Sequence, residues 1–80
     1  MDTTSTLTGR DRAILRAVAG GTAELGGGAE PDLFLDGRFC CDQAAVHRLA
    51  RAGLIAPAAA LLGQRVPARL TEQGLFALAA

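Results

Sequence analysis

The 80-residue chain lacks several residue types, and each absence narrows what the chain can be. It has no Trp, no Tyr and no Lys, and its three aromatic residues are all Phe. The core must therefore be built from Leu, Ile and Val. No apolar run is long enough to span a bilayer, and no charged-then-apolar N-terminus suggests a signal peptide. We therefore expect a cytoplasmic protein without membrane contact.

The chain also has no excess of positive or negative charge. Eight basic and eight acidic residues give a formal net charge of zero, which argues against a strongly electrostatic nucleic-acid binder. All the basic residues are Arg, which suits bidentate contacts with phosphate and guanine, although a GC-rich genome would favour Arg over Lys in any case.

Residues that could hold a metal or perform catalysis are scarce. Cys40 and Cys41 are the only cysteines and His47 is the only histidine, and their spacing matches no zinc pattern. A disulfide between neighbouring residues is strained, so we expect reduced, mostly buried thiols. Cys41 near a helix N-terminus, together with His47, is a weak catalytic alternative. The sequence therefore predicts no enzyme, no metal site and no cofactor.

Residues 42–55 carry the clearest pattern in the chain and predict a helix over residues 43–52. Asp42 is a favourable N-cap, because its carboxylate can accept a bond from a backbone N–H of the first turn. Gly53 is placed where a helix ends in a left-handed residue, and the apolar dipeptide after it predicts a strand.

The two sides of this predicted helix differ. At about 100° per residue, Val46, Leu49 and Ala50 gather on one side as a packing stripe. The other side offers amide, imidazole and guanidinium groups, which proteins use to contact base edges and phosphates. Its members are Gln43, Ala44, His47, Arg48 and Arg51. The alternative is a solvated face on an ordinary core helix.

Two further helices have recognisable starts. Thr8 and Asp11 form a capping box that predicts a helix over residues 9–19. Thr71 is an N-cap for a last helix over residues 72–79. Residues 1–7 are expected to be flexible, and residues 8–80 to form one domain.

Two turns predict two short hairpins. Asp36-Gly37 between apolar runs favours a type I′ turn, with Phe34 facing Phe39 across the strands. The second hairpin has residues 62–65 as its connection and pairs Leu61 with Val66. It leaves two arginines on the outward face of the sheet, Arg65 and Arg69.

The apolar pattern also predicts a core. Leu75 and Leu78 form the inner stripe of the last helix, and Phe76 points elsewhere, which makes Phe76 a candidate dimer contact. The residues expected to be buried together are Ile14, Leu15, Val18, Val46, Leu49, Leu54, Leu61, Val66, Leu70 and Leu75.

The order of elements resembles a small bacterial winged-helix domain of the actinobacterial type. Residues 46–55, Val-His-Arg-Leu-Ala-Arg-Ala-Gly-Leu-Ile, are similar to the end of a recognition helix running into the wing. Residues 69–75, Arg-Leu-Thr-Glu-Gln-Gly-Leu, are similar to the return strand of the wing and the helix after it. The chain departs from the family where a helix normally precedes the recognition helix, because Pro31 and Asp36-Gly37 predict a hairpin there.

The resemblance implies an α+β, winged-helix-like fold of three helices and two short β-hairpins, the second being the wing. It implies a transcription regulator or accessory factor that contacts double-stranded DNA. Helix 43–52 would read bases and the 62–65 wing would contact the backbone. The alternative is an interaction module that binds a protein, or a second copy of the chain, through Phe76 and the last helix, without nucleic acid.

Overall fold

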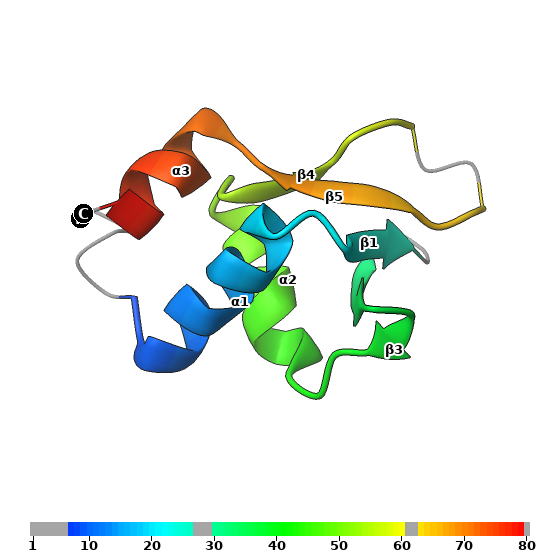
Figure 1. Ribbon diagram of the computed structural model, residues 1–80, viewed down its shortest axis with the longest axis horizontal. Helices are drawn as coiled ribbons and strands as arrows, with labels where there is room; N and C mark the ends of the chain where they lie inside the picture. The colour runs from blue at the N-terminus through cyan, green and yellow to red at the C-terminus, as the bar shows by residue number, and fades with distance from the viewer. Residues whose placement is uncertain (1–6, 27–29, 61–62, 80) are drawn as a thin grey trace.

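The computed structural model describes residues 7–26, 30–60 and 63–79, which fold into three helices and a five-stranded antiparallel sheet (Figure 1). The predicted α+β class is confirmed. The strands lie side by side in the order β3-β2-β1-β5-β4, so β5 lies between β1 and β4. In chain order the elements are α1 (Gly9–Ala19), β1 (Ala23–Gly26), β2 (Asp32–Leu35), β3 (Arg38–Phe39), α2 (Gln43–Arg51), β4 (Ile55–Pro57), β5 (Val66–Leu70) and α3 (Glu72–Ala79).

The helices begin where the capping residues predict. The Thr8 hydroxyl accepts a bond from the Asp11 N–H at 3.0 Å, and the Asp11 carboxylate accepts one from the Thr8 N–H at 3.0 Å. This reciprocal pair satisfies two backbone donors that α1 itself cannot pair. At α2 the Asp42 carboxylate accepts from the Ala45 N–H at 3.1 Å. Each cap thus sets the residue at which its helix begins.

The β2–β3 hairpin has the predicted turn. Asp36 and Gly37 have φ angles of 52° and 79°, and two positive φ values in succession are the signature of a type I′ turn. Phe34 lies opposite Phe39, and their rings meet edge to face with centroids 5.6 Å apart. The predicted register of this hairpin is therefore confirmed.

The β4–β5 hairpin has a different register from the predicted one. Pairing Leu61 with Val66 would put Pro57 opposite Leu70, but Pro57 lies opposite Ala68, two residues away. The ladder is anchored at its other end, where the Thr71 N–H donates to the Leu54 carbonyl at 3.0 Å. An even shift leaves each side chain on its predicted face. Leu61 and Leu62, parts of the predicted pair and wing, lie outside the described residues.

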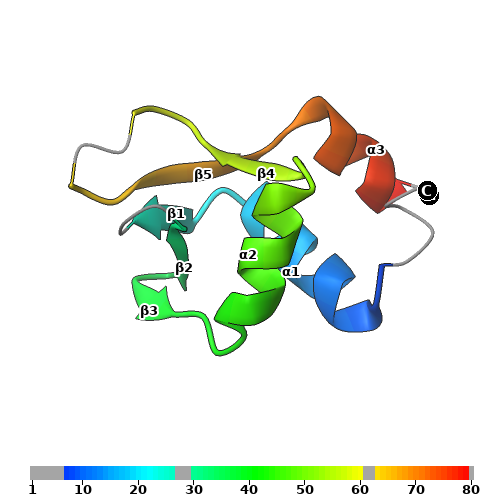
Figure 2. The same cartoon turned by 180° about the vertical axis from the view of Figure 1, so that it is seen from behind.

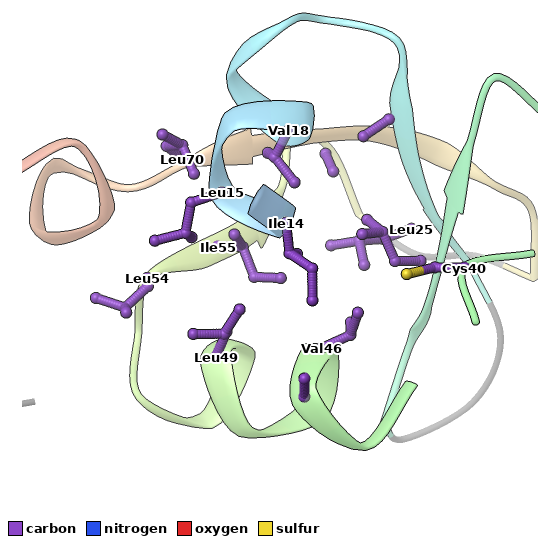
Figure 3. Close-up of a cluster of buried hydrophobic side chains, with 14 of the residues drawn as sticks. Ile14, Leu15, Val18, Leu25, Cys40, Val46, Leu49, Leu54, Ile55 and Leu70 are labelled. Atoms are coloured by element: carbon purple, nitrogen blue, oxygen red, sulfur yellow. The ribbon is translucent and has the colours of Figure 1, made fainter. Parts of the chain in front are cut away.

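The core forms between the helices and one face of the sheet (Figure 3). The inward sides of α1 and α2 meet Leu25 and Leu33 from the sheet, and Leu54 follows from the end of α2. Of the predicted core, Val66 is half-buried and seven residues are buried: Ile14, Leu15, Val18, Val46, Leu49, Leu54 and Leu70.

Helix α3 packs through a different side from the predicted one. Leu75 was expected inside but is 57% exposed, whereas Gly74 and Ala77 are buried and Leu78 is half-buried. The reason is a close approach of two backbones, because a Cβ added at Gly74 would lie 2.0 Å from the Leu54 carbonyl oxygen. Only glycine allows this contact, so the helix turns Gly74 inward and Leu75 outward.

Candidate nucleic-acid interface

Helix α2 is attached to the β2–β3 hairpin by the side chain of Gln43. Its Nε2 donates to the carbonyls of Leu33 and Cys40, each at 2.9 Å, and its Oε1 accepts from the Leu33 N–H at 2.9 Å. These three bonds engage the amide inside the protein. Gln43 therefore positions α2, and its base-reading group is directed to the hairpin rather than to solvent.

Arg48 pairs with a carboxylate that the sequence reasoning did not connect to it. Its Nη2 donates to Oδ1 of Asp11, a buried residue that also caps α1. The sequence contained one indication that Asp11 is buried. Asp11 precedes Leu15 by four residues and Val18 by seven, so it lies on the apolar stripe of α1. The Arg48 side chain is still 56% exposed, so it neutralises the buried acid from the surface.

The side chains of His47 and Arg51 on α2 meet acids on either side of Pro31. Nε2 of His47 lies 3.0 Å from Oδ1 of Asp32. Nη2 of Arg51 donates to both carboxylate oxygens of Glu30, at 3.1 Å and 2.8 Å. Arg51 is 70% exposed at its side chain, and its pair with Glu30 lies at the surface.

The basic side chains of α2 and the acids that meet them come from different elements. The helix contributes His47, Arg48 and Arg51 and has no acidic residue of its own. Each carboxylate that meets these side chains comes from α1, from β2 or from the residue before Pro31. Ala44, also predicted to face DNA, is exposed near the start of the helix and leaves room beside the polar groups. The outward side of α2, the helix labelled near the centre of Figure 2, thus carries basic side chains that meet carboxylates from other elements.

Arg65 and Arg69 lie elsewhere. Along β5 the alternate residues Ala68 and Leu70 are buried, so Arg69 points to the opposite, outward face of the sheet. The Arg65 guanidinium lies 4.4 Å from the ring centroid of Phe34, with its Nε 4.0 Å from a Glu24 carboxylate oxygen. The structure therefore does not bring Arg65 and Arg69 together with the basic side chains of α2.

A glycine positions Arg65. A Cβ at Gly26 would lie 2.6 Å from Cγ of Arg65, so the side chain crosses β1 only because that residue is glycine. The crossing brings the guanidinium over Phe34 on β2, in a cation–π contact. Arg69 is exposed, and its Nη1 donates to the Leu70 carbonyl at 3.5 Å.

A pocket of about 420 Å³ adjoins the cationic side of α2. It lies between α2 and β4, its lining is mainly apolar, and His47 and Arg51 are among the residues that line it. The lining residues are Leu25, Glu30, Pro31, His47, Ala50, Arg51, Gly53, Ile55, Ala56, Pro57 and Thr71.

Within the described residues, no group of three or more His, Cys, Asp or Glu side chains is placed to hold a metal ion. Cys40 is buried and Cys41 is exposed, and both are free thiols. The expectation of mostly buried thiols is therefore correct for Cys40 and wrong for Cys41, which lies in the exposed turn before the α2 cap. None of the described helices is long and apolar enough to cross a membrane.

Comparison with known proteins assigns no role to this surface. No protein family, no curated protein and no solved structure matches the sequence. The functional residues must therefore be identified from the geometry and charge of the chain itself, and α2 carries two arginines and the only histidine of the sequence.

Proposed function

We propose that the chain is a winged-helix-type domain of a bacterial transcription regulator or accessory factor, and that it binds double-stranded DNA. Two features support the winged-helix assignment. The sheet order β1-β5-β4 and the passage of α2 through Gly53 into β4 match the strand and wing arrangement expected for that fold. The β2–β3 hairpin takes the position of the supporting helix, and the connection from β4 to β5 is the wing.

The observation that carries the proposal is the absence of acidic residues from α2. A nine-residue helix with two arginines, a histidine and no carboxylate presents no negative side chain of its own to whatever lies against it. Guanidinium groups suit phosphate oxygens, and those of Arg48 and Arg51 are mostly exposed. In this proposal α2 lies along the DNA, with His47, Arg48 and Arg51 on phosphates and with Ala44 towards base edges.

The ion pairs predict that binding is weak. Exposed pairs contribute only about 0–1 kcal/mol each, so phosphates can displace the carboxylates from Arg51 and His47. A net charge of zero supplies no long-range attraction to add to these contacts. Affinity should therefore be low for a single copy and should fall as salt rises.

Titration of a fluorescein-labelled duplex at 25 mM and 150 mM salt tests the proposal. Arg51→Gln should weaken binding and make the slope of log K against log salt shallower by about 0.9, the value for one phosphate contact. The matched control is Arg16→Gln, which removes an exposed arginine from α1. Arg69→Gln should weaken binding to all sequences alike, as expected for a backbone contact of the wing. Absence of duplex binding at 25 mM salt would contradict the proposal.

A second candidate function is protein binding through α3, and one observation favours it. Phe76 is 73% exposed and lies beside the exposed Leu75, and Ala79 extends this outward stripe by one turn. Beyond the exposed Glu72 and Gln73, the outward side of α3 is thus apolar, and contiguous exposed apolar side chains mark an interaction surface. The partner in this case is a second copy of the chain or another protein with an apolar groove.

A further inference from the structure

Glu30 and Asp32 stand on either side of Pro31, and each directs its carboxylate at a different side chain of α2, Glu30 at Arg51 and Asp32 at His47. We propose that these two carboxylates occupy phosphate positions of the α2 surface, so that the free protein covers its own DNA-contact groups. This inference rests on the proposed DNA binding. It assigns two phosphate subsites, at Arg51 and at His47, and it identifies the groups that compete for them.

The geometry at Arg51 is that of oxyanion recognition. One guanidinium nitrogen lies within hydrogen-bond distance of both Glu30 oxygens, at 3.1 Å and 2.8 Å. A phosphate presents two oxygens in a similar way, which is why Arg binds carboxylate and phosphate alike. At His47 the ring nitrogen Nε2 meets a single oxygen of Asp32 at 3.0 Å, a contact that one phosphate oxygen can replace.

These two pairs differ from the third pair on α2. Asp11 is buried and caps α1, so the protein needs the Arg48 partner to neutralise a charge inside the fold. The Glu30 and Asp32 side chains are both partly exposed, and neither caps a helix. When these two carboxylates leave their partners on α2, water can solvate them without any change in the core. A ligand can therefore displace Glu30 and Asp32 while the fold stays intact.

Two double variants with the same change in net charge test the inference. Glu30→Gln/Asp32→Asn removes the covering carboxylates and keeps side chains of nearly the same size. Asp36→Asn/Glu72→Gln removes two exposed carboxylates, at the β2–β3 turn and at the start of α3, that have no ion pair within the described residues. Each variant would be titrated with the labelled duplex over a salt series, with circular dichroism to confirm an unchanged fold.

The first variant should bind the duplex about 3- to 30-fold more tightly than the wild type, the range expected from removing two competing surface pairs. Its salt slope should be steeper than that of the wild type, because no released carboxylate then takes up a cation from solution when the duplex binds. The control variant gains only the general effect of net charge, so its increase should be clearly smaller. Adding Arg51→Gln to the first variant should remove most of its gain.

The possible results distinguish a failure of this inference from a failure of the proposed DNA binding. A larger gain for Glu30→Gln/Asp32→Asn than for the control, reversed by Arg51→Gln, supports the inference. Equal gains would show that only net charge matters and would overturn it. Wild-type binding with no gain in the first variant would overturn the inference and leave DNA binding standing. If neither the wild type nor any variant binds duplex at 25 mM salt, both fail.

Discussion

Replacing Gly74 by Ala would raise the helix propensity of α3 but would also place a methyl group where the packing leaves no room. Gly74 lies inside α3, where Ala is favoured over Gly by about 1 kcal/mol. The fold opposes the substitution, because the added Cβ would lie 2.0 Å from the Leu54 carbonyl oxygen and 3.0 Å from its carbon. Both atoms belong to the backbone at the entry to β4, so no side-chain rotation can relieve the contact.

The packing effect should be larger than the propensity effect. Forcing an extra methyl group into a packed site costs about 1–3 kcal/mol, and a backbone neighbour places this site at the upper end. Helix α3 would have to move away from Leu54, which loosens the buried Ala77. After subtracting the helix gain, Gly74→Ala should lower the free energy of unfolding by about 1–2 kcal/mol. In a domain of this size that change lowers Tm by about 4–16 °C.

Thermal unfolding followed by far-UV circular dichroism measures this shift. Gly9→Ala is a matched control, because Gly9 is also helical and a Cβ there would have no atom within 4 Å. Gly9→Ala should leave Tm unchanged or raise it slightly. If Gly74→Ala melts at or above the wild-type temperature, α3 does not approach Leu54 as described, and the account of why Leu75 faces outward is wrong.

Three other substitutions test separate parts of the structure. Leu49→Ala should reduce the free energy of unfolding by about 2–5 kcal/mol, because Leu49 is fully buried; an unchanged Tm would mean that α2 faces the other way. Gln43→Ala should cost about 1–3 kcal/mol by leaving the Leu33 N–H of β2 without its Gln43 partner, and hydrogen exchange at the Leu33 amide should accelerate. Phe76→Ser should shift sedimentation equilibrium towards monomer if α3 is a self-association surface, whereas Phe39→Ser, at an aromatic residue 60% exposed on β3, should not.

Local structure was predictable from the sequence where one or two neighbouring residues determine it. The Thr8–Asp11 capping box, the Asp42 cap and the Asp36-Gly37 turn act over a few residues, so each could be identified without knowing the rest of the fold. The pairing of Phe34 with Phe39 follows directly from the turn type.

Features that depend on distant parts of the chain could not be predicted in this way. The β4–β5 register is fixed by Thr71 meeting Leu54 rather than by the turn between the strands. The orientation of α3 depends on how closely Gly74 approaches another backbone, which no apolar pattern encodes.

The candidate site was predictable only in part. The helical pattern correctly identified the polar side of α2, but it contained no information about the acids that meet it. Asp11 is far from Arg48 in sequence, and Glu30 is far from Arg51. The bonds of the Gln43 amide to Leu33 were also absent from the pattern, because they require the hairpin to fold back beside the start of the helix.

The position of β5 in the sheet has a consequence for how the protein is synthesised and folds. Pro67 on β5 pairs with Glu24 on β1, about forty residues earlier, and contacts of such separation form slowly. Until residues 66–70 leave the ribosome, β1 and β4 have no strand between them and each presents an unpaired edge. Unpaired edges favour pairing with other chains. Nascent chains that stop before Val66 should therefore aggregate, while the β2–β3 hairpin, whose contacts are local, can form during synthesis.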